Sequence, residues 1–468
     1  MEPRLRPGLF AGESRCSIYN LRVSDPVQAG RRKLLTVLGV TFGIAVTVGN
    51  SIGAGILRVP GTIAGYLPEF WPYMAIWVVG ALYALLGTNA LAELGTMVPR
   101  SGGQYVFVRH ALGDYAGFVV GWSDWLSTCG TSAAVAILVG EYAVGLIPEL
   151  RTPVVVALVV VATLTIIQWM GVRWGGGAQT LTSIMKAIAL LVLVAACFIL
   201  GSHNPTASTM QVEREMPFMV ALLLSLQGVI YTYDGWSAPI YFTEEMRDYG
   251  RSVPRSMFAG LATVTAVYLL INIGFAAVVP LPTLAGKNFA AATVAEHLFG
   301  MNGDTVLRVI MVVSLISAVN SSILMAPRVL FAMSQDGLFW RAATEVNRGG
   351  TPDVALLINS VIAAGFIVTG TFDTVIAKLA FFFVANYALS FLSLFVLRRR
   401  EPDAARPYRA WGHPIATGIA LVASVSFLIG AVVLDPKNSL YTLALLAVSI
   451  PAFAAIRAAG RARPVAGE

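Results

Sequence analysis

Two stretches of small and polar residues interrupt long apolar segments of the chain. The first runs from Gly49 to Gly55 and the second from Tyr233 to Pro239. Dense glycines weaken a helix, each costing about 1 kcal/mol relative to alanine, so we expect the backbone to unwind at both places. The N-terminus of a half-helix favours a carboxylate, and the carbonyl groups at a half-helix C-terminus suit an ammonium group. A zwitterionic amino acid matches both kinds of end.

The two interruptions fall in the first helix of each of two predicted runs of five apolar segments. This correspondence is typical of transporters built from inverted repeats, whose binding site lies near the middle of the bilayer. Because lipid cannot satisfy the freed backbone groups, those groups must face protein, water or a ligand. The alternative is that the glycines only let helices pack closely. Two interruptions in corresponding positions favour the transporter interpretation.

Ionisable side chains within apolar segments are costly to bury, so each is a candidate functional residue. Lys186 lies in the middle of the fifth segment, Arg58 lies on the outer half of the first, and Asp234 belongs to the second interruption. Asp234 could hold a substrate ammonium group or pair with Arg58. Four further polar residues could line a cavity or only form hydrogen bonds between helices: Asp124, Asn320, Ser321 and Asn386.

A bundle of about twelve membrane-spanning helices must position these residues. Of the 468 residues, 57% are hydrophobic and only 12% are charged, whereas about 25% are charged in a soluble protein. Apolar runs of about 20 residues explain the difference, since each can cross a bilayer. We predict an all-α membrane protein with helices at 34–66, 72–97, 112–147, 153–171, 178–201, 217–243, 255–280, 304–333, 354–371, 374–397, 412–434 and 439–458.

The distribution of basic residues predicts the orientation of the bundle. Most of the 32 Lys and Arg residues lie in the tails and in the loops on one side, as expected of the cytoplasmic side. We therefore predict cytoplasmic tails at 1–33 and 459–468, in a plasma or inner membrane. The bias explains the net charge of +7 without a nucleic-acid partner. Three acidic residues near segment ends are expected to pair with loop arginines and to form an inner gate: Glu93, Glu244 and Glu245.

No pattern of catalytic or metal-binding residues stands out in the sequence. We therefore predict a protein that is not an enzyme, with no metal site and no cofactor. The three cysteines, Cys16, Cys129 and Cys197, show no metal-ligand spacing. None is placed in a predicted outer loop, so no disulfide-linked partner subunit is expected.

Several motifs resemble the amino acid–polyamine–organocation (APC) superfamily of permeases, and in particular its L-type amino acid transporter branch. They are Gly53-Ala54-Gly55-Ile56 with Pro60, Pro99 to Tyr105, Gly117-Phe118, Gly121-Trp122, Tyr233 to Trp236, Glu244-Glu245, Pro254-Arg255, Arg328, Asp336-Gly337 and Arg406-Pro407-Tyr408. The resemblance implies the leucine-transporter fold, in which five helices and an inverted copy of five are followed by two extra helices. It places the first repeat at 34–201, the second at 217–397 and the extra helices at 412–458.

The resemblance also implies where a substrate would bind. The backbone of the first interruption would hold the substrate carboxylate, and the second interruption would hold the amino group. Tyr231 matches an aromatic gate of the L-type branch, or is ordinary core packing, and Arg58 and Trp236 are further gate candidates. The candidate substrate-binding residues are Ile52, Gly53, Ala54, Gly55, Ile56, Tyr231, Tyr233, Asp234 and Gly235.

Lys186 matches a lysine that occupies the place of a sodium ion between the first and eighth helices in many members of this family. A fixed ammonium group there would tie the two halves together without sodium. Because burial disfavours a charge, this lysine could instead carry a proton, or be a structural residue bonded to carbonyl groups. Arg58 and Asp234 depart from the family pattern, which has an apolar residue and, in the L-type branch, a glycine at these positions.

The sequence thus predicts a secondary transporter of amino acids that works by alternating access, either as an exchanger or with protons. Neutral L-amino acids are the expected substrates, because the sixth segment carries aromatic residues and no clear acidic cluster is evident in the predicted pocket. An amine, polyamine or cationic amino acid carrier, with Asp234 as the counter-ion, is the alternative within the class. A sensor that binds amino acids without moving them is the alternative of another class.

Overall fold

The computed structural model of the chain describes residues 33–201, 216–287, 289–370, 372–434 and 436–461. The predicted tails therefore lie almost wholly outside the described residues, as does Cys16. Helices dominate this part of the chain, and its only β pairing is an isolated bridge between Leu38 and Met246. The prediction of an all-α protein is confirmed.

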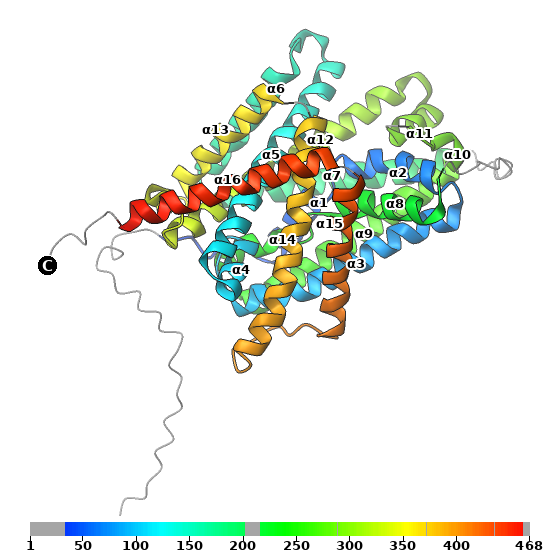
Figure 1. The fold of residues 1–468 in the computed structure, drawn as a ribbon. Coiled ribbons are helices and arrows are strands. Elements are labelled where there is room, and N and C mark those ends of the chain that lie inside the picture. The colour runs from blue at the N-terminus through cyan, green and yellow to red at the C-terminus, as the bar shows by residue number, and fades with distance from the viewer. Residues whose placement is uncertain (1–32, 202–215, 288, 371, 435, 462–468) are drawn as a thin grey trace, which may run out of the picture.

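The helices follow one another in the predicted order (Figure 1). The first half contains α1 (Val40–Ser51), α2 (Gly55–Tyr66), α3 (Phe70–Met97), α4 (Gln104–Leu112), α5 (Asp114–Leu146), α6 (Pro153–Trp169) and α7 (Val172–Leu200). The second half contains α8 (Phe218–Tyr233), the 3₁₀-helix η4 (Ala238–Glu245), α9 (Tyr249–Val278), α10 (Leu281–Leu284), α11 (Ala290–Phe299), α12 (Gly303–Gln335), α13 (Asp353–Thr369) and α14 (Phe372–Arg400). Two further helices end the described chain, α15 (Ile415–Leu434) and α16 (Pro436–Arg461).

The lengths and composition of these helices agree with a protein that crosses a membrane many times. Eight helical segments are long and apolar enough to span a bilayer, and the bent pair of α1 and α2 makes a ninth. Three shorter apolar helices, at 153–169, 353–369 and 446–458, lie where further spans were predicted, and the number of twelve spans stays a prediction. The division into two inverted repeats stays a prediction.

Both predicted interruptions are real breaks in the helices. The first predicted span is two helices, α1 and α2, whose axes differ by 46° across residues 52–54. The sixth span leaves the α-helix after Tyr233 and resumes at Ala238 as the 3₁₀-helix η4. The α-helix ends at these places because glycine destabilises a helical backbone and proline lacks the N–H group that a helical hydrogen bond needs.

Some connections between the predicted spans contain short helices. Helix α4 fills the connection before α5, and α10 and α11 fill the connection before α12. These helices have 9, 4 and 10 residues, which is too short to cross a bilayer. A search for long apolar runs therefore passes over them.

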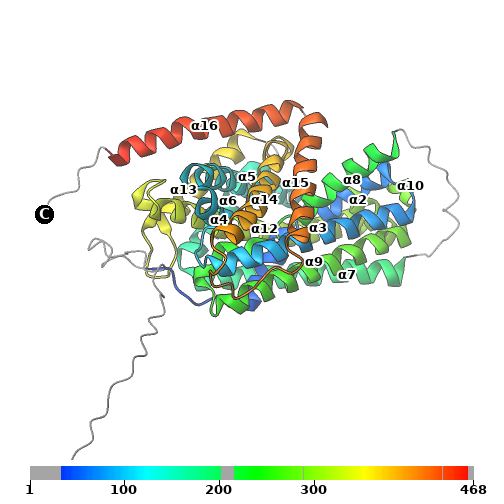
Figure 2. The ribbon, with the colours of Figure 1, turned by 60° about the horizontal axis from the view of Figure 1, so that its bottom comes forward.

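Most residues at both breaks are buried inside the bundle, and other helices pack around them. Helix α1 packs against α7, α9 and α12, and α12 packs along α5. Helices α6 and α13 lie side by side near one edge (Figure 1), and α16 extends across one face of the bundle (Figure 2). The start of α1 and the end of η4 are tied by two backbone hydrogen bonds, from the Leu38 N–H to the Glu245 carbonyl at 2.9 Å and from the Arg247 N–H to the Leu38 carbonyl at 2.8 Å.

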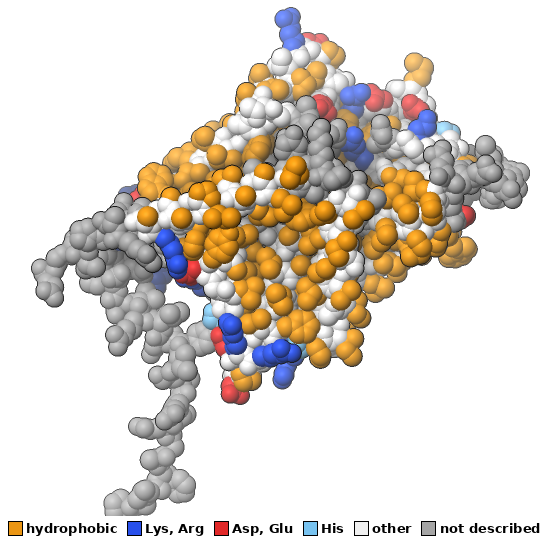
Figure 3. Space-filling model, in the orientation of Figure 1, with side chains coloured by type: hydrophobic (Ala, Val, Ile, Leu, Met, Phe, Trp, Pro, Cys, Tyr) orange, Lys and Arg blue, Asp and Glu red, His pale blue; other side chains and the backbone are white. Residues whose placement is uncertain are grey.

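The outer surface shows where lipid would lie. A broad hydrophobic face covers the middle of the molecule, and charged side chains gather near its two ends (Figure 3). Large apolar side chains are exposed on several of the outer helices, including Val159 and Ile166 on α6, Ile188 and Val192 on α7, and Val422 and Ile429 on α15. Such an extended apolar surface is costly in water and favourable in a bilayer.

Candidate functional site

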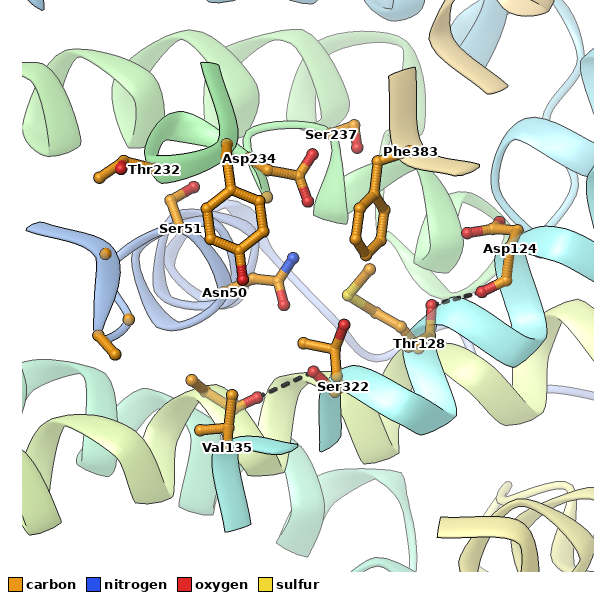
Figure 4. Close-up of a pocket in the computed structure, with 18 of the residues that line it drawn as sticks. Asn50, Ser51, Asp124, Thr128, Val135, Thr232, Asp234, Ser237, Ser322 and Phe383 are labelled. Carbon is orange, nitrogen blue, oxygen red and sulfur yellow. Dashed lines mark hydrogen bonds between the residues drawn. The ribbon is translucent and has the colours of Figure 1, made fainter. Parts of the chain in front are cut away.

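A cavity of about 330 Å³ lies where the two breaks meet. Figure 4 shows side chains converging on it from several directions, with Asn50 and Ser51 from the first break, Asp124 from α5 and Asp234 from the second break. The residues that line it are Asn50, Ser51, Gly53, Ala54, Gly55, Arg58, Val59, Thr62, Gln104, Asp124, Thr128, Thr131, Val135, Tyr231, Thr232, Asp234, Gly235, Ser237, Tyr241, Ala318, Ser322, Met325, Phe383 and Tyr387.

At the first break, the predicted residues 53–55 line the cavity, while Ile52 and Ile56 have their side chains fully buried outside it. A methyl group added at Gly53 would meet nothing within 4 Å, so open space borders the backbone at this glycine. Helix α2 starts at Gly55, and the first N–H groups of a helix have no partner one turn back. The break therefore offers backbone donors to a carboxylate, with the positive end of the α2 dipole behind them.

At the second break, three of the predicted residues line the cavity, namely Tyr231, Asp234 and Gly235. The Asp234 carboxylate accepts a hydrogen bond from the Tyr387 hydroxyl at 2.5 Å, and that hydroxyl also lies 3.2 Å from the Ser237 hydroxyl. This gives Asp234 a different partner from Arg58, the residue that the sequence suggested, although both side chains line the same cavity.

The other two predicted aromatic residues of this break lie outside the cavity lining. Tyr233 is fully buried and packs edge-on against Tyr268, with ring centroids 4.9 Å apart. Trp236 is 1% exposed and stacks on the Tyr387 ring at 4.7 Å. Both support the residues that face the cavity.

The two breaks are in direct contact. Gly235 has a φ of +111°, and a methyl group there would lie 2.6 Å from the backbone nitrogen of Ser51. From α9, the Tyr268 hydroxyl lies 2.7 Å from the Ser51 carbonyl and 2.8 Å from the Thr232 carbonyl. One buried hydroxyl thus reaches the last carbonyl groups of both α1 and α8, which no neighbouring turn of helix satisfies.

Lys186 supports the first break without lining the cavity. Its buried ammonium group donates hydrogen bonds to the carbonyl of Gly49, at 2.8 Å, and to the carbonyl of Ile52. Contact with α12, the eighth span, is made by the residue one turn earlier, since the Ser183 hydroxyl lies 3.0 Å from that of Ser317 and 2.7 Å from the Ala45 carbonyl. The positive charge thus lies at the C-terminal end of α1, where a helix dipole favours it.

Of the four polar residues left open by the sequence, only Asp124 lines the cavity. Asn320 donates to the Gln179 side-chain oxygen at 2.8 Å, Ser321 donates to Asn50 at 3.2 Å, and Asn386 accepts from Ser123 at 3.0 Å. These three residues form hydrogen bonds between helices, which was the second possibility stated for them.

Sequence reasoning missed several lining residues. In the sequence, no local pattern distinguishes three aromatic lining residues from other aromatic residues of apolar segments: Tyr241, Tyr387 and Phe383. A signal did exist on α5, where Asp124, Thr128, Thr131 and Val135 follow the spacing of one helix face, and all four line the cavity.

Buried ion pairs close the end of the bundle at which α3, η4, α12 and α14 finish. The Glu245 carboxylate accepts two hydrogen bonds from the Arg328 guanidinium, at 2.8 and 2.9 Å, and both side chains are 1% exposed or less. Glu93 pairs with Arg398 at 2.5 Å and with Arg406 at 3.0 Å. The predicted pairing of Glu93 with arginines is confirmed, whereas the partner of Glu245 lies within α12 rather than in a loop.

A third carboxylate at this end, Asp336, holds the short helix α4 in place. It pairs with Arg109 at 3.0 Å and with Arg100 at 3.1 Å, and it accepts a hydrogen bond from the Tyr105 hydroxyl at 2.9 Å. Burial and the neighbouring Asp336 charge raise the pKa of Tyr105 well above its usual value, so this phenol remains a neutral donor at physiological pH.

The sequence is similar to known membrane proteins over most of its length. The family model for amino acid permeases matches residues 33–452. The serine/threonine exchanger SteT of Bacillus subtilis is 27% identical over 412 residues, which cover 86% of this chain and 92% of that protein. The b(0,+)-type amino acid transporter 1 of Homo sapiens is 25% identical over 417 residues, which cover 87% of this chain and 85% of that protein. The Asc-type amino acid transporter 1 of Mus musculus is 28% identical over 384 residues, which cover 80% of this chain and 72% of that protein.

Proposed function

The chain belongs to the amino acid permease family, and from this membership we propose that it exchanges amino acids across a membrane by alternating access around the cavity between its two breaks. It is a multi-pass membrane protein and a transporter rather than an enzyme. The observation that carries the proposal is the direct contact of two broken helices around one cavity.

The cavity offers complementary groups to the two ends of a zwitterion. In this proposal the substrate carboxylate binds the backbone of residues 53–55 and the N-terminus of α2, where N–H groups and the helix dipole favour an anion. The substrate ammonium group binds Asp234 and the carbonyl groups at the end of α8. Tyr231, which lines the cavity beside them, closes over the bound substrate as the aromatic gate.

The side chain of the substrate is decided by the rest of the cavity. The expectation of a neutral side chain depended on the aromatic residues of the sixth span and on there being no clear acidic cluster in the pocket. The cavity lining instead contains two carboxylates, Asp124 and Asp234, together with Arg58. The second reason therefore no longer favours a neutral substrate, and the charged groups of the lining bear on which amino acid side chain the cavity accepts.

Exchange is favoured over proton-coupled uptake by the surroundings of Lys186. Both hydrogen bonds of the ammonium group go to backbone carbonyls of the first break, so the charge serves as a fixed structural cation. A neutral amine would still have two donors for these carbonyls, but it would lose the charge that the C-terminal end of the α1 dipole favours. The relative from Bacillus subtilis, which matches 86% of the chain, is named an exchanger, and this also favours exchange.

The proposal includes the orientation and the subunit composition predicted from the sequence. The basic end of the bundle and both termini face the cytoplasm, in agreement with the positive-inside rule. The protein functions without a disulfide-linked partner, since the two cysteines within the described residues, Cys129 and Cys197, are buried in the bundle.

Reconstitution tests the proposed exchange directly. Purified protein is placed in liposomes that are either empty or preloaded with unlabelled amino acids, with and without an inward proton gradient. We expect radiolabelled amino acid to enter only the preloaded vesicles. Gradient-driven entry into empty vesicles would contradict exchange in favour of proton symport, and binding without any entry would favour a sensor.

Replacing Lys186 with methionine should reduce exchange by about ten-fold or more, because hydrogen bonds to a charged group contribute about 1.5–3 kcal/mol each and hold the first break in shape. Initial rates of uptake into preloaded vesicles measure the effect. Met185 is the matched control, since its side chain is 45% exposed on the outer surface of the same helix, and Met185→Ala should exchange like the wild type. An unchanged rate for Lys186→Met would show that the break holds its shape without the ammonium group.

A further inference from the structure

A second carboxylate shares the cavity with Asp234. Asp124 projects from α5, is 2% exposed, and lines the cavity. In Figure 4 the Phe383 ring lies between the two carboxylates, so that they face different parts of the same space. The substrate ammonium group assigned to Asp234 therefore leaves Asp124 for another group of the ligand.

The Asp124 carboxylate is poorly satisfied by the protein itself. Its oxygens lie 2.8 and 2.9 Å from a single hydroxyl, that of Tyr241, which has only one proton to donate. An ionised carboxylate has about four acceptor positions. Among the ion pairs of the described residues, none includes Asp124. A buried carboxylate without a counter-charge is unfavourable, so the arrangement calls for a cation from outside the protein.

A second unsatisfied group lies on the same face of α5. The Thr131 hydroxyl is buried, lines the cavity, and has no hydrogen-bond partner among the described residues. Thr128, between it and Asp124, donates to the Asp124 backbone carbonyl at 2.7 Å instead. Buried polar groups nearly always find a partner, so this face of α5 is a polar surface that a ligand completes.

The charges of the lining fit one class of substrate. Two carboxylates and the guanidinium of Arg58 leave one negative charge in excess. An α-amino acid with a cationic side chain has one positive charge in excess, whereas a neutral amino acid has none and a diamine has no carboxylate for the first break. We propose that Asp124, positioned by Tyr241, binds the side-chain ammonium or guanidinium group of a cationic amino acid. This assignment rests on the proposed exchange of amino acids.

Lysine and norleucine provide the test, because norleucine has almost the shape of lysine but lacks the terminal ammonium group. Vesicles containing the full-length protein are preloaded with a mixture of unlabelled amino acids, and each external competitor is titrated against uptake of labelled substrate. For the wild type, we expect lysine to halve uptake at a concentration about ten-fold or more below that of norleucine, as a charge-assisted hydrogen bond predicts. Asp124→Asn should reduce this advantage to about two-fold or less by weakening lysine alone.

Two variants separate the charge of Asp124 from its place in the fold. Asp124→Glu keeps the charge and should keep the preference for lysine. Asp114→Asn makes the same change at the exposed start of α5, where the carboxylate pairs with Arg109 and Arg457, and should behave like the wild type. If Asp124→Asn no longer exchanges, thermal stabilisation of the purified variant by lysine and by norleucine replaces the uptake measurement.

The outcomes distinguish the two proposals. Exchange of amino acids with no advantage for lysine, or with an advantage that survives Asp124→Asn in uptake or in thermal stabilisation, would overturn the role of Asp124 and leave the proposed function intact. Exchange of no amino acid by the wild type would overturn both. Loss of the lysine advantage in Asp124→Asn, with norleucine unaffected, would establish the second subsite.

Discussion

Replacing Arg328 with methionine should lower the free energy of unfolding by about 3–5 kcal/mol, the usual cost of removing one partner of a buried ion pair. The Glu245 carboxylate that receives two hydrogen bonds from Arg328 is fully buried, so it would be left with an uncompensated charge. The Arg328 guanidinium also lies 4.7 Å from the centre of the Phe242 ring and donates to the Leu324 carbonyl at 2.6 Å. The contacts with Glu245 and Phe242 join α12 to η4, the second half of a broken span, whereas the bond to Leu324 lies within α12.

Thermal unfolding of the purified protein in detergent measures this loss. The matched control is Arg251→Gln, because Arg251 and Asp248 form an exposed pair at 3.9 Å that should contribute about 1 kcal/mol or less. The double variant Glu245→Gln, Arg328→Met removes both charges and should be more stable than the sum of the single losses predicts. An Arg328→Met protein that unfolds at the same temperature as the wild type would show that the pair contributes nothing to stability.

Replacing Gly235 with alanine should reduce exchange by about ten- to a hundred-fold, since backbone strain of this kind costs about 1–3 kcal/mol and each 1.4 kcal/mol is a factor of ten. The φ of +111° at Gly235 is unfavourable for any residue with a side chain. The added methyl carbon would also lie 2.6 Å from the Ser51 nitrogen and 2.8 Å from the Asn50 carbonyl carbon. The two breaks would have to move apart, and the cavity between them would change shape.

Initial exchange rates in preloaded vesicles, with the amount of folded protein measured in parallel, test this expectation. Gly177→Ala is the control, because Gly177 lies exposed within α7 and a methyl group there would meet nothing within 4 Å. Alanine in a helix interior is favoured over glycine by about 0.5–1 kcal/mol, so this variant should be at least as stable and should exchange normally. Wild-type exchange by Gly235→Ala would mean that close contact of the breaks is not needed for transport.

The spans could be predicted because their signal is local. Each apolar run carries its own length and composition, and nine of the twelve predicted helices begin and end within a few residues of those observed. The exceptions are α1, which begins later than expected at Val40, and α7 and α9, which begin earlier than expected at Val172 and Tyr249. In α7 and α9, polar residues at the start of the helix shortened the apolar run that marks it.

The partners of the site residues could not be predicted in the same way. Asp124 and Tyr241 are 117 positions apart, and Tyr268 reaches the Ser51 carbonyl across 217 positions. Helix packing within a membrane depends on small residues and hydrogen bonds rather than on an apolar stripe. The pattern of a single helix therefore does not reveal which face meets which neighbour.

By itself, the sequence determined that the chain crosses a membrane many times, that its first and sixth spans are broken, and that most basic residues lie in the tails and in the loops of one side. Composition, glycine density and loop charge are properties of short stretches, and they hold in any arrangement of the helices. Only the tertiary structure decided that the breaks touch at Gly235, that Asp124 shares their cavity, and that Lys186 bonds the carbonyl groups of Gly49 and Ile52. Those facts depend on long-range packing, because a buried carbonyl or carboxylate takes whichever donor the fold brings within reach.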